Sequence, residues 1–490
     1  MIKCGNNFHW LSEQSRLTPD ARAIITRDKV LSYSEFHSDV INLADNLVRL
    51  GIKEKEHVGI LYRHSYFFTV VVNAIWFTGA VPVPINTRCS IDEIRYQIQQ
   101  AGLKHLLLSE ELSEHFSELS FRGKNIISES LPGNHSEDKQ DFHNSSFSPL
   151  NKALIMFTSG SSGKPKAVVH NFNSLFESVN NLDSFSGLQD RDVWLASLPL
   201  YHIGGFMIPV RALLSGGSLV FPDSLRHEDL AGALKEKCPT HLSFVSTTLA
   251  RFIDDKFVPS KNLKHAFLGG GPATSELCIR AIDNYWPIVK VYGSTETCSM
   301  VTALLPEDVK LRPDSSGKVT GSNKITIKDN SGAGAGIIDH GEILVSSKSL
   351  FTEYLNDPKA TESVLQNGVF STGDLGSVDN EGYLYLSSRR NDLIITGGEN
   401  VSPLEIEETL LSKSSVKDAF VFSASDDKWG EIVCAAVVSE NESETEIKNF
   451  LKEKIAGYKI PKRYYFLDHI PRTEMGKVKR GELMKLLNLG

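Results

Sequence analysis

The chain has 490 residues, which is enough for two or more domains with cores of their own. Its formal net charge of -8 is opposite in sign to the basic surface of a general nucleic-acid binder. The six cysteines include no CxxC pair, which argues against a disulfide framework or a zinc site and favours reduced thiols in a cytoplasmic protein.

The first third of the chain alternates helix and strand signals. Apolar residues recur at helical spacing after Ser34, which can cap a helix that Gly51 then ends. Further strands are expected at residues 58–61, 81–85 and 106–108, and further helices at residues 67–77 and 91–101. This βαβ alternation implies a mostly parallel sheet covered on both faces.

The most apolar stretch, residues 66–85, approaches the length of a membrane span. Asn73, Gly79, Pro82 and Pro84 interrupt it, so it predicts a buried helix followed by a strand. The first residues have no apolar core of the kind found in a signal peptide, so we expect no export signal. The polar residues that follow, up to about residue 152, predict a variable surface segment.

The segment Thr158–Lys166, with the sequence TSGSSGKPK, has the composition of a phosphate-binding loop. Glycines let backbone amides turn toward an anion, and hydroxyls and lysines add donors and positive charge. It is not a Walker A loop, because its glycines are too close together and Pro165 prevents a helix from starting there. Apolar runs at residues 153–157 and 167–169 predict a strand on each side, and an ordinary Gly/Ser-rich hairpin stays open as an alternative. The expected phosphate contacts are Thr158, Ser159, Gly160, Ser161, Ser162, Gly163, Lys164 and Lys166.

Helix and strand signals alternate again over residues 193–301, and their pattern changes after Arg389. Between them, residues 325–345 predict short antiparallel strands with a glycine-rich turn at residues 331–336. Beyond Arg389, helices are expected at residues 403–411 and 444–454 and strands at residues 419–423 and 433–438. We therefore expect an N-terminal domain over residues 1–388, a hinge at residues 389–392 and a C-terminal domain over residues 393–490.

Further polar motifs lie downstream at long intervals. Glycines follow the expected strand 265–268, at the end where open α/β sheets bind ligands. Glu296 lies among hydroxyls after the next strand, an arrangement that suits a magnesium ion shared with nucleotide phosphates. Asp374, in an expected tight turn, suits two sugar hydroxyls, and Lys477 follows a glycine near the end of the sequence. Each motif alone is common, so their combination carries the interpretation.

In order and spacing these motifs resemble the adenylate-forming acyl-CoA synthetase superfamily over nearly the whole chain. The resemblance implies an α/β fold: a large N-terminal domain of two mixed or parallel sheets with flanking helices and a small β-barrel-like part, then a small α+β domain. It implies ATP, Mg²⁺ and coenzyme A as reactants or cofactors. A carboxylate would attack the α-phosphorus of ATP, pyrophosphate would leave, and a thiol would then attack the acyl-adenylate.

The resemblance also implies roles for particular residues. Thr158–Lys166 would hold the β- and γ-phosphates, Glu296 would help to bind magnesium, and Asp374 and Arg389 would hold the ribose. Lys477 would bridge the carboxylate and the α-phosphate, and rotation of the C-terminal domain would then open a thiol channel near residues 397–398. Further nucleotide contacts would come from Gly270, Gly271, Pro272, Tyr292, Gly293 and Thr295, and contacts to the acid from Gly269 and Ser294.

Residues 198–214 bear on the identity of the acid. His202 resembles the family residue that lies near the carboxylate, with a core histidine as the alternative. Arg211 is a lone cation in an apolar segment, so it either extends to solvent or meets an anion. The o-succinylbenzoate–CoA ligases of menaquinone synthesis carry a basic residue at this offset, where it can face the second carboxylate of the substrate. This resemblance favours an acid–CoA ligase acting on o-succinylbenzoate.

Other hypotheses stay open at this point. The acid could be another aryl or medium-chain acid, with Arg211 purely structural, or the acceptor could be the phosphopantetheine of a carrier protein. A non-catalytic nucleotide-binding relative should have lost Lys477 or Glu296, and both are present. The expected partners are a small-molecule acid, ATP and CoA, without nucleic acid or membrane insertion, and a homodimer is an open option.

Overall fold

The computed structural model describes residues 9–113, 119, 123–127, 148–158, 165–271, 273–328, 341–389, 393–440, 442–471 and 478–489. The chain divides into two compact units. The larger contains Met1–Thr87, Ile98–Phe157 and Ala167–Ser388, and the smaller contains Arg88–Gln97, Thr158–Lys166 and Arg389–Gly490.

Helix α2 (Tyr33–Arg49) follows the N-terminal helix α1 (Trp10–Leu17) and buries its apolar stripe in the larger unit. Its N-cap is Ser32, so the expectation that Ser34 caps it is wrong. The Ser32 side chain accepts the Glu35 backbone N–H, and the Glu35 carboxylate accepts the Ser32 backbone N–H. This reciprocal pair satisfies two amides at once, which no other arrangement of these serines offers.

A four-stranded parallel sheet matches the expected βαβ alternation. Its order is β4-β3-β5-β6, and helices α3 (Tyr66–Phe77) and α4 (Ile91–Ala101) connect its first strands. The strands are β3 (His57–Leu61), β4 (Val81–Pro84), β5 (His105–Leu108) and β6 (Lys124–Ile127). Helix α3 is almost entirely buried, and none of the helices that the structure describes is long and apolar enough to cross a membrane.

The second sheet has nine strands in the order β15-β14-β13-β12-β11-β9-β10-β1-β2. Its central strands run parallel, and β2, β14 and β15 at the two edges run antiparallel to their neighbours. The strands are β1 (Arg22–Ile25), β2 (Val30–Ser32), β9 (Val193–Leu195), β10 (Ser218–Val220), β11 (His241–Phe244), β12 (His265–Leu268), β13 (Ile288–Ser294), β14 (Ser299–Leu304) and β15 (Lys318–Val319).

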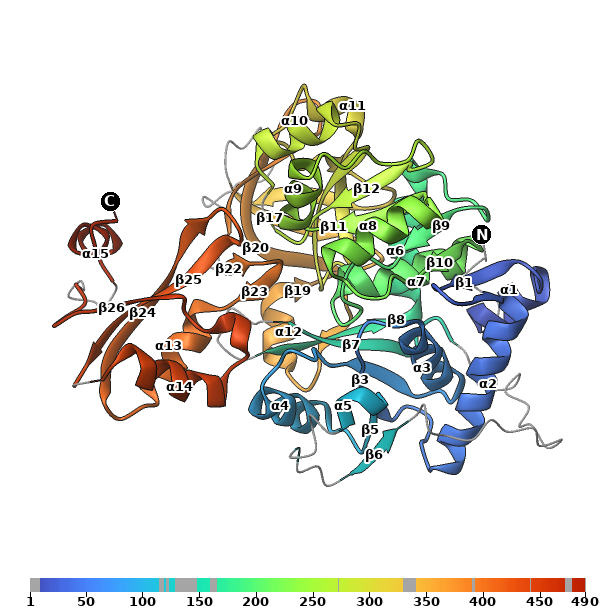
Figure 1. Cartoon of the computed structure of the whole chain (residues 1–490), viewed down its shortest axis with the longest axis horizontal. Coiled ribbons are helices and arrows are strands. Elements are labelled where there is room, and N and C mark those ends of the chain that lie inside the picture. The colour runs from blue at the N-terminus through green and yellow to red at the C-terminus, as the bar shows by residue number, and fades with distance from the viewer. Residues whose placement is uncertain are drawn as a thin grey trace. The chain divides into compact units, whose positions relative to one another are not determined.

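Successive side chains along these strands enter different cores. Trp194 packs in the core formed with α2, α3, α6 (Phe172–Ser186) and α7 (Ile203–Ser215), whereas its neighbour Leu195 packs in the opposite core. Helices α8 (His227–Lys237), α9 (Ser246–Asp254) and α10 (Ser275–Asp283) cover that second face (Figure 1). The sheet therefore separates two cores, and α7 lies over one of them.

Smaller sheets complete the larger unit. Strands β7 (Lys152–Thr158), β8 (Lys166–Asn171) and β18 (Glu353–Tyr354) form one of them. Strands β16 (Lys324–Lys328), β17 (Gly341–Ser346), β19 (Leu365–Gln366) and β20 (Val369–Val378) form another, with β21 (Leu384–Arg389) beside β20. Its β16–β17 hairpin confirms the expected antiparallel strands, and the expected glycine-rich turn lies outside the described residues.

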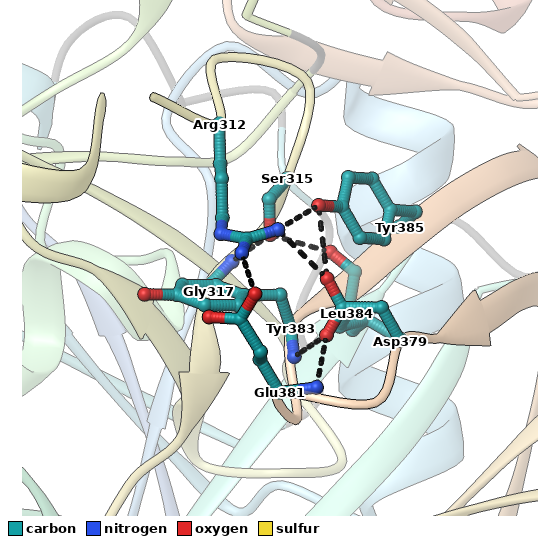
Figure 2. A network of polar contacts seen from close by, with 8 residues as sticks. All are labelled: Arg312, Ser315, Gly317, Asp379, Glu381, Tyr383, Leu384 and Tyr385. Atoms are coloured by element: carbon teal, nitrogen blue, oxygen red, sulfur yellow. Dashed lines mark hydrogen bonds and ion pairs between the residues drawn. The ribbon is translucent and has the colours of Figure 1, made fainter. Parts of the chain in front are cut away.

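A network of hydrogen bonds and ion pairs stabilises the turn between β20 and β21 (Figure 2). One guanidinium nitrogen of Arg312, Nη1, donates to Asp379 at 3.0 Å and to the Tyr385 hydroxyl at 3.3 Å, and the other donates to Glu381. Asp379 Oδ1 accepts the backbone N–H groups of Glu381 and Tyr383, both at 2.9 Å. The turn is thereby tied to the segment that precedes β15.

Replacing Arg312 with methionine is expected to loosen this turn locally. The Glu381 and Tyr383 amides should then exchange hydrogen faster, because Asp379 loses the cation that orients it. Hydrogen exchange followed by mass spectrometry tests this, with amides of β11 as an internal reference. Unchanged protection of the turn would contradict the role given to Arg312.

The smaller unit contains the expected α+β element pattern. Strands β22 (Ile394–Thr396), β23 (Glu399–Val401), β24 (Val416–Asp426), β25 (Gly430–Ser439) and β26 (Arg463–Phe466) form its sheet. Helices α13 (Pro403–Leu411) and α14 (Glu444–Lys454) pack on one face, and α15 (Arg480–Leu486) covers the other (Figure 1). Both longer helices have the bounds that the sequence predicts.

Candidate active site

The flanks of the glycine-rich loop agree with the strand, loop, strand prediction. Strands β7 and β8 are neighbours in their sheet, and the segment that follows the loop is a strand rather than the helix of a Walker A motif. The Thr158 hydroxyl donates weakly to the Lys166 carbonyl at 3.5 Å. Several expected site residues lie outside the described part of the chain: Ser159, Gly160, Ser161, Ser162, Gly163, Lys164, Pro272 and Lys477. The side chain of Arg389 also lies outside it.

Strands β13 and β14 form a tight hairpin whose turn contains Glu296. Their register shifts between Tyr292 and Gly293, and β13 extends to Ser294. A Cβ atom on Gly293 would lie 1.8 Å from the Ser299 carbonyl oxygen. Only glycine allows this approach of the two strands, so the close contact explains the residue at that position.

Glu296 is held in place by residues from other elements. The buried Tyr354 hydroxyl donates to Glu296 Oε1 at 2.9 Å, and Phe351 donates its N–H to the Glu296 carbonyl at 2.8 Å. His170 Nε2 donates to the neighbouring Thr295 carbonyl at 2.8 Å, and burial lowers the pKa of this histidine to about 4, so it is neutral. A carboxylate oriented in this way is an oxygen ligand of the kind that magnesium binds.

Replacing Tyr354 with phenylalanine is expected to weaken the binding of magnesium. Glu296 would lose a hydrogen bond that orients its carboxylate both before and after the metal binds. Only part of the free energy of that bond, roughly 1 kcal/mol, therefore bears on magnesium, and the magnesium concentration for half-maximal activity should rise about fivefold. The maximal rate at saturating magnesium should change little. Titrating activity with magnesium tests this beside Glu296→Gln, and an unchanged magnesium requirement in Tyr354→Phe would contradict it.

Asp374 and Tyr292, which are far apart in the sequence, meet in the structure. The Tyr292 hydroxyl donates to Asp374 Oδ2 at 2.8 Å. Asp374 lies in an irregular part of β20, where five residues of β20 (371–375) oppose three of β17 (342–344), and not in the expected tight turn. The backbone of Gly373 is in the left-handed region, with φ of 75°, and the Asp374 N–H donates to Thr372 Oγ1 at 3.0 Å. Such a bulge aims a side chain away from the regular ladder.

The glycines after β12 lie where the sequence predicts them, at the carboxyl end of a central parallel strand. A Cβ atom on Gly269 would lie 2.7 Å from Val291 Cγ2, on the neighbouring strand. Gly270 has φ of 78°. These two positions leave the backbone uncovered at the edge of the sheet where open α/β folds bind ligands.

His202 is the N-cap residue of α7, and its ring lies edge-on to Tyr201 with 4.9 Å between ring centroids. The preceding turn packs closely on the helix, because a Cβ atom on Gly205 would lie 2.0 Å from the Pro199 carbonyl oxygen. This contact fixes the start of α7, and with it the direction of the helix that bears Arg211.

Arg211 points into the protein and not to solvent. Its side chain is 1 % exposed, and its Cζ atom lies 5.9 Å from the Trp194 ring centroid and 6.0 Å from that of Phe267. Nη2 donates to Ser299 Oγ at 2.9 Å, and among the described residues Nε has no partner and the side chain has no carboxylate partner. Burial lowers the pKa of Arg211 to about 10, so it is still a cation near neutral pH.

The surroundings of Arg211 are what sequence reasoning missed. The residues near Arg211 are Trp194, His241, Phe267 and Ser299. They come from β9, β11, β12 and β14, whereas Arg211 lies on α7, and only Arg211 was singled out from the sequence. A polar residue that opens a buried strand, such as His241, was the available signal.

The fold is that of an α/β enzyme whose expected nucleotide motifs lie at strand ends and whose buried arginine lies on α7, over one face of the large sheet. The sequence matches the AMP-binding enzyme family over residues 11–355 and the C-terminal domain of AMP-binding enzymes over residues 405–477. The chain therefore belongs to the AMP-binding enzyme family.

Several proteins that are similar to this chain have names that state an activity. A 2-succinylbenzoate–CoA ligase of Bacillus cereus strain Q1 is 33% identical over 484 residues, which cover 98% of each chain. The structure of an o-succinylbenzoate CoA synthetase double mutant from Bacillus subtilis, bound to a product analogue, has a TM-score of 0.91 and 30% identity, and the match covers 97% of this chain and 98% of that one. The enzyme from the same organism with ATP and a magnesium ion has a TM-score of 0.72 and 30% identity, covering 97% and 98%.

Proposed function

We propose that this protein is an ATP-dependent 2-succinylbenzoate–CoA ligase that forms AMP. The carrying observation is Arg211, a buried cation without a carboxylate partner among the described residues. An acid with a second carboxylate supplies the anion that this guanidinium lacks, whereas a fatty acid or a simple benzoate does not. The 33% identity to a 2-succinylbenzoate–CoA ligase along 98% of each chain supports the same substrate.

The reaction takes place in two steps. One substrate carboxylate attacks the α-phosphorus of ATP, which forms the acyl-adenylate and releases pyrophosphate. The thiol of coenzyme A then attacks the acyl carbon, and AMP leaves as the thioester forms. In the first step the protein mainly positions the reactants and neutralises charge, and Lys477 bridges the attacking carboxylate and the α-phosphate.

The nucleotide is bound by residues from several elements. Thr158–Lys166 surrounds the terminal phosphates, Asp374 and Arg389 bind the ribose hydroxyls, and Tyr292 orients Asp374 through its hydroxyl. Glu296, held by Tyr354, would bind the magnesium ion that accompanies ATP, and this ion would neutralise phosphate charge. Gly269 and Ser294 border the acid, and His202 lies near the carboxylate that reacts.

Several properties of the whole chain belong to this proposal. Residues 1–388 act as the adenylation domain and residues 393–490 as a mobile domain, joined by a hinge at residues 389–392. We assign the enzyme to the cytoplasm, where ATP and coenzyme A are available, and to menaquinone biosynthesis, because the o-succinylbenzoate–CoA ligases that it resembles belong to that pathway. A homodimer stays a prediction that light scattering can test.

The test is pyrophosphate release from ATP and magnesium with a panel of acids, each with and without coenzyme A. The panel contains 2-succinylbenzoate and its two monoacid analogues, 4-oxo-4-phenylbutanoate and 2-butanoylbenzoate, together with benzoate and a medium-chain fatty acid. Strong preference for the diacid, with thioester formed only when coenzyme A is present, is the expected result. Equal or faster turnover of the monoacids would overturn 2-succinylbenzoate as the substrate. No pyrophosphate release with any acid would overturn the ligase activity.

A further inference from the structure

Several polar atoms around Arg211 have no hydrogen-bond partner among the described residues. They are Arg211 Nε, Trp194 Nε1, His241 Nε2 and, on the strand paired with β14, Ser294 Oγ. Trp194 and His241 are fully buried, so water does not replace the missing partners at the surface. Leaving buried polar groups unpaired is costly, and several of them around one cation indicate that a ligand completes the set.

His241 belongs to the same group of rings as the guanidinium. Its ring stacks on Trp194 with centroids 4.4 Å apart and lies 6.3 Å from Phe267 in a nearly parallel orientation. Arg211 Cζ lies about as far from these same two rings, at 5.9 Å from Trp194 and 6.0 Å from Phe267. His241 and Arg211 therefore lie against the same two rings, on the face of the sheet that α7 covers.

The other ring nitrogen of His241 is already engaged. Nδ1 lies 2.7 Å from Thr240 Oγ1, and this hydroxyl accepts the Val193 N–H at 2.8 Å and lies 3.1 Å from the Val193 carbonyl oxygen. The contact to Nδ1 is the shorter of the two that the hydroxyl hydrogen can make, and when that hydrogen goes to Nδ1, the proton of the neutral imidazole is on Nε2. Nε2–H is then a further buried donor without a partner among the described residues, as are Arg211 Nε and Trp194 Nε1.

We propose that His241 is a substrate-binding residue that determines specificity, with Nε2–H donating to the substrate carboxylate that Arg211 neutralises. This inference rests on the proposed function and adds a second, neutral contact to it. A planar carboxylate has two oxygens, so one can accept from the guanidinium while the other accepts from the imidazole. Thr240 acts as a positioning residue, because it fixes the tautomer of the histidine.

The experiment compares His241→Phe, His241→Gln and His241→Asn in the full-length enzyme. Phenylalanine keeps the stack on Trp194 and removes the donor, glutamine puts an amide N–H near the position of Nε2, and asparagine puts it near Nδ1. The kcat and KM values are measured for 2-succinylbenzoate and for whichever monoacid analogue the wild type turns over. His227→Phe, which removes a histidine packed against Phe252 on the other face of the sheet, is the matched control.

His241→Phe should raise KM for the diacid on the order of 10- to 100-fold, the range of a hydrogen bond to a charged group, with kcat and the monoacid KM little changed. His241→Gln should restore most of the affinity, and His241→Asn should not. Equal changes for diacid and monoacid, no change in either, or the same change in His227→Phe would overturn the inference. If His241→Phe does not fold, the glutamine and asparagine pair decides. A wild type without preference for the diacid would instead overturn the proposed function, before any variant is made.

Discussion

Replacing Arg211 with methionine is expected to remove most of the preference for 2-succinylbenzoate over a monoacid analogue. The ratio of the two kcat/KM values should fall on the order of 100-fold or more, because a buried carboxylate would lose its charged partner at a cost of about 3 kcal/mol or more. Turnover of the monoacid should persist, since methionine fills a similar space and the nucleotide contacts lie elsewhere. Steady-state kinetics with both acids is the measurement.

The same variant is not expected to lose stability. Arg211 is buried, and its Nε has no partner among the described residues, so its burial costs free energy in the ligand-free protein. Arg211→Met should leave the free energy of unfolding in urea unchanged or raise it by about 1–2 kcal/mol. A variant that loses both stability and monoacid turnover would show that Arg211 is structural.

Replacing Lys477 with alanine is expected to slow adenylation on the order of 100- to 1,000-fold, which corresponds to loss of a charge that stabilises the transition state. The thioester step should be spared, because rotation of the C-terminal domain is expected to remove Lys477 from the site before the thiol attacks and AMP leaves. Pyrophosphate release measures the first step, and AMP release from purified 2-succinylbenzoyl-adenylate with coenzyme A measures the second.

Lys479 provides the control for that experiment. It lies two residues further along the chain and forms an exposed ion pair with Glu482 at 3.0 Å. Lys479→Ala should have nearly wild-type rates in both steps, since exposed ion pairs contribute little. Equal slowing of both steps in Lys477→Ala would contradict its assignment to adenylation alone.

Local signals predicted most of the regular elements. Helices α4, α13 and α14 and strand β12 have the predicted bounds, because apolar spacing and flanking turn residues specify them. The cap of α2 was misplaced, since Ser32 and Ser34 are both plausible caps and only the pairing of Ser32 with Glu35 decides between them. The bulge at Asp374 was not predicted, because it depends on how β20 pairs with β17.

The candidate site shows the same division between local and tertiary information. Glu296, Asp374 and Arg211 stand out in the sequence as single polar residues in recognisable motifs. Their partners Tyr354, Tyr292 and Ser299 come from other elements, at sequence separations of 58 for Glu296 and Tyr354, 82 for Tyr292 and Asp374, and 88 for Arg211 and Ser299. No spacing rule connects residues so far apart, so only the folded chain reveals which hydroxyl meets each charge.

The placement of α7 over one face of the large sheet has an evolutionary consequence. Arg211 and His241, which are assigned to the second carboxylate of the acid, come from this helix and from a strand beneath it, whereas the groups assigned to ATP come from strand ends, loops and the bulge in β20. A lineage can therefore exchange a few side chains beneath α7 and acquire a new acid without rebuilding its nucleotide chemistry. Because loss of the guanidinium is not expected to lower the stability of the fold, we expect Arg211 to be retained only under continuing selection for a charged substrate.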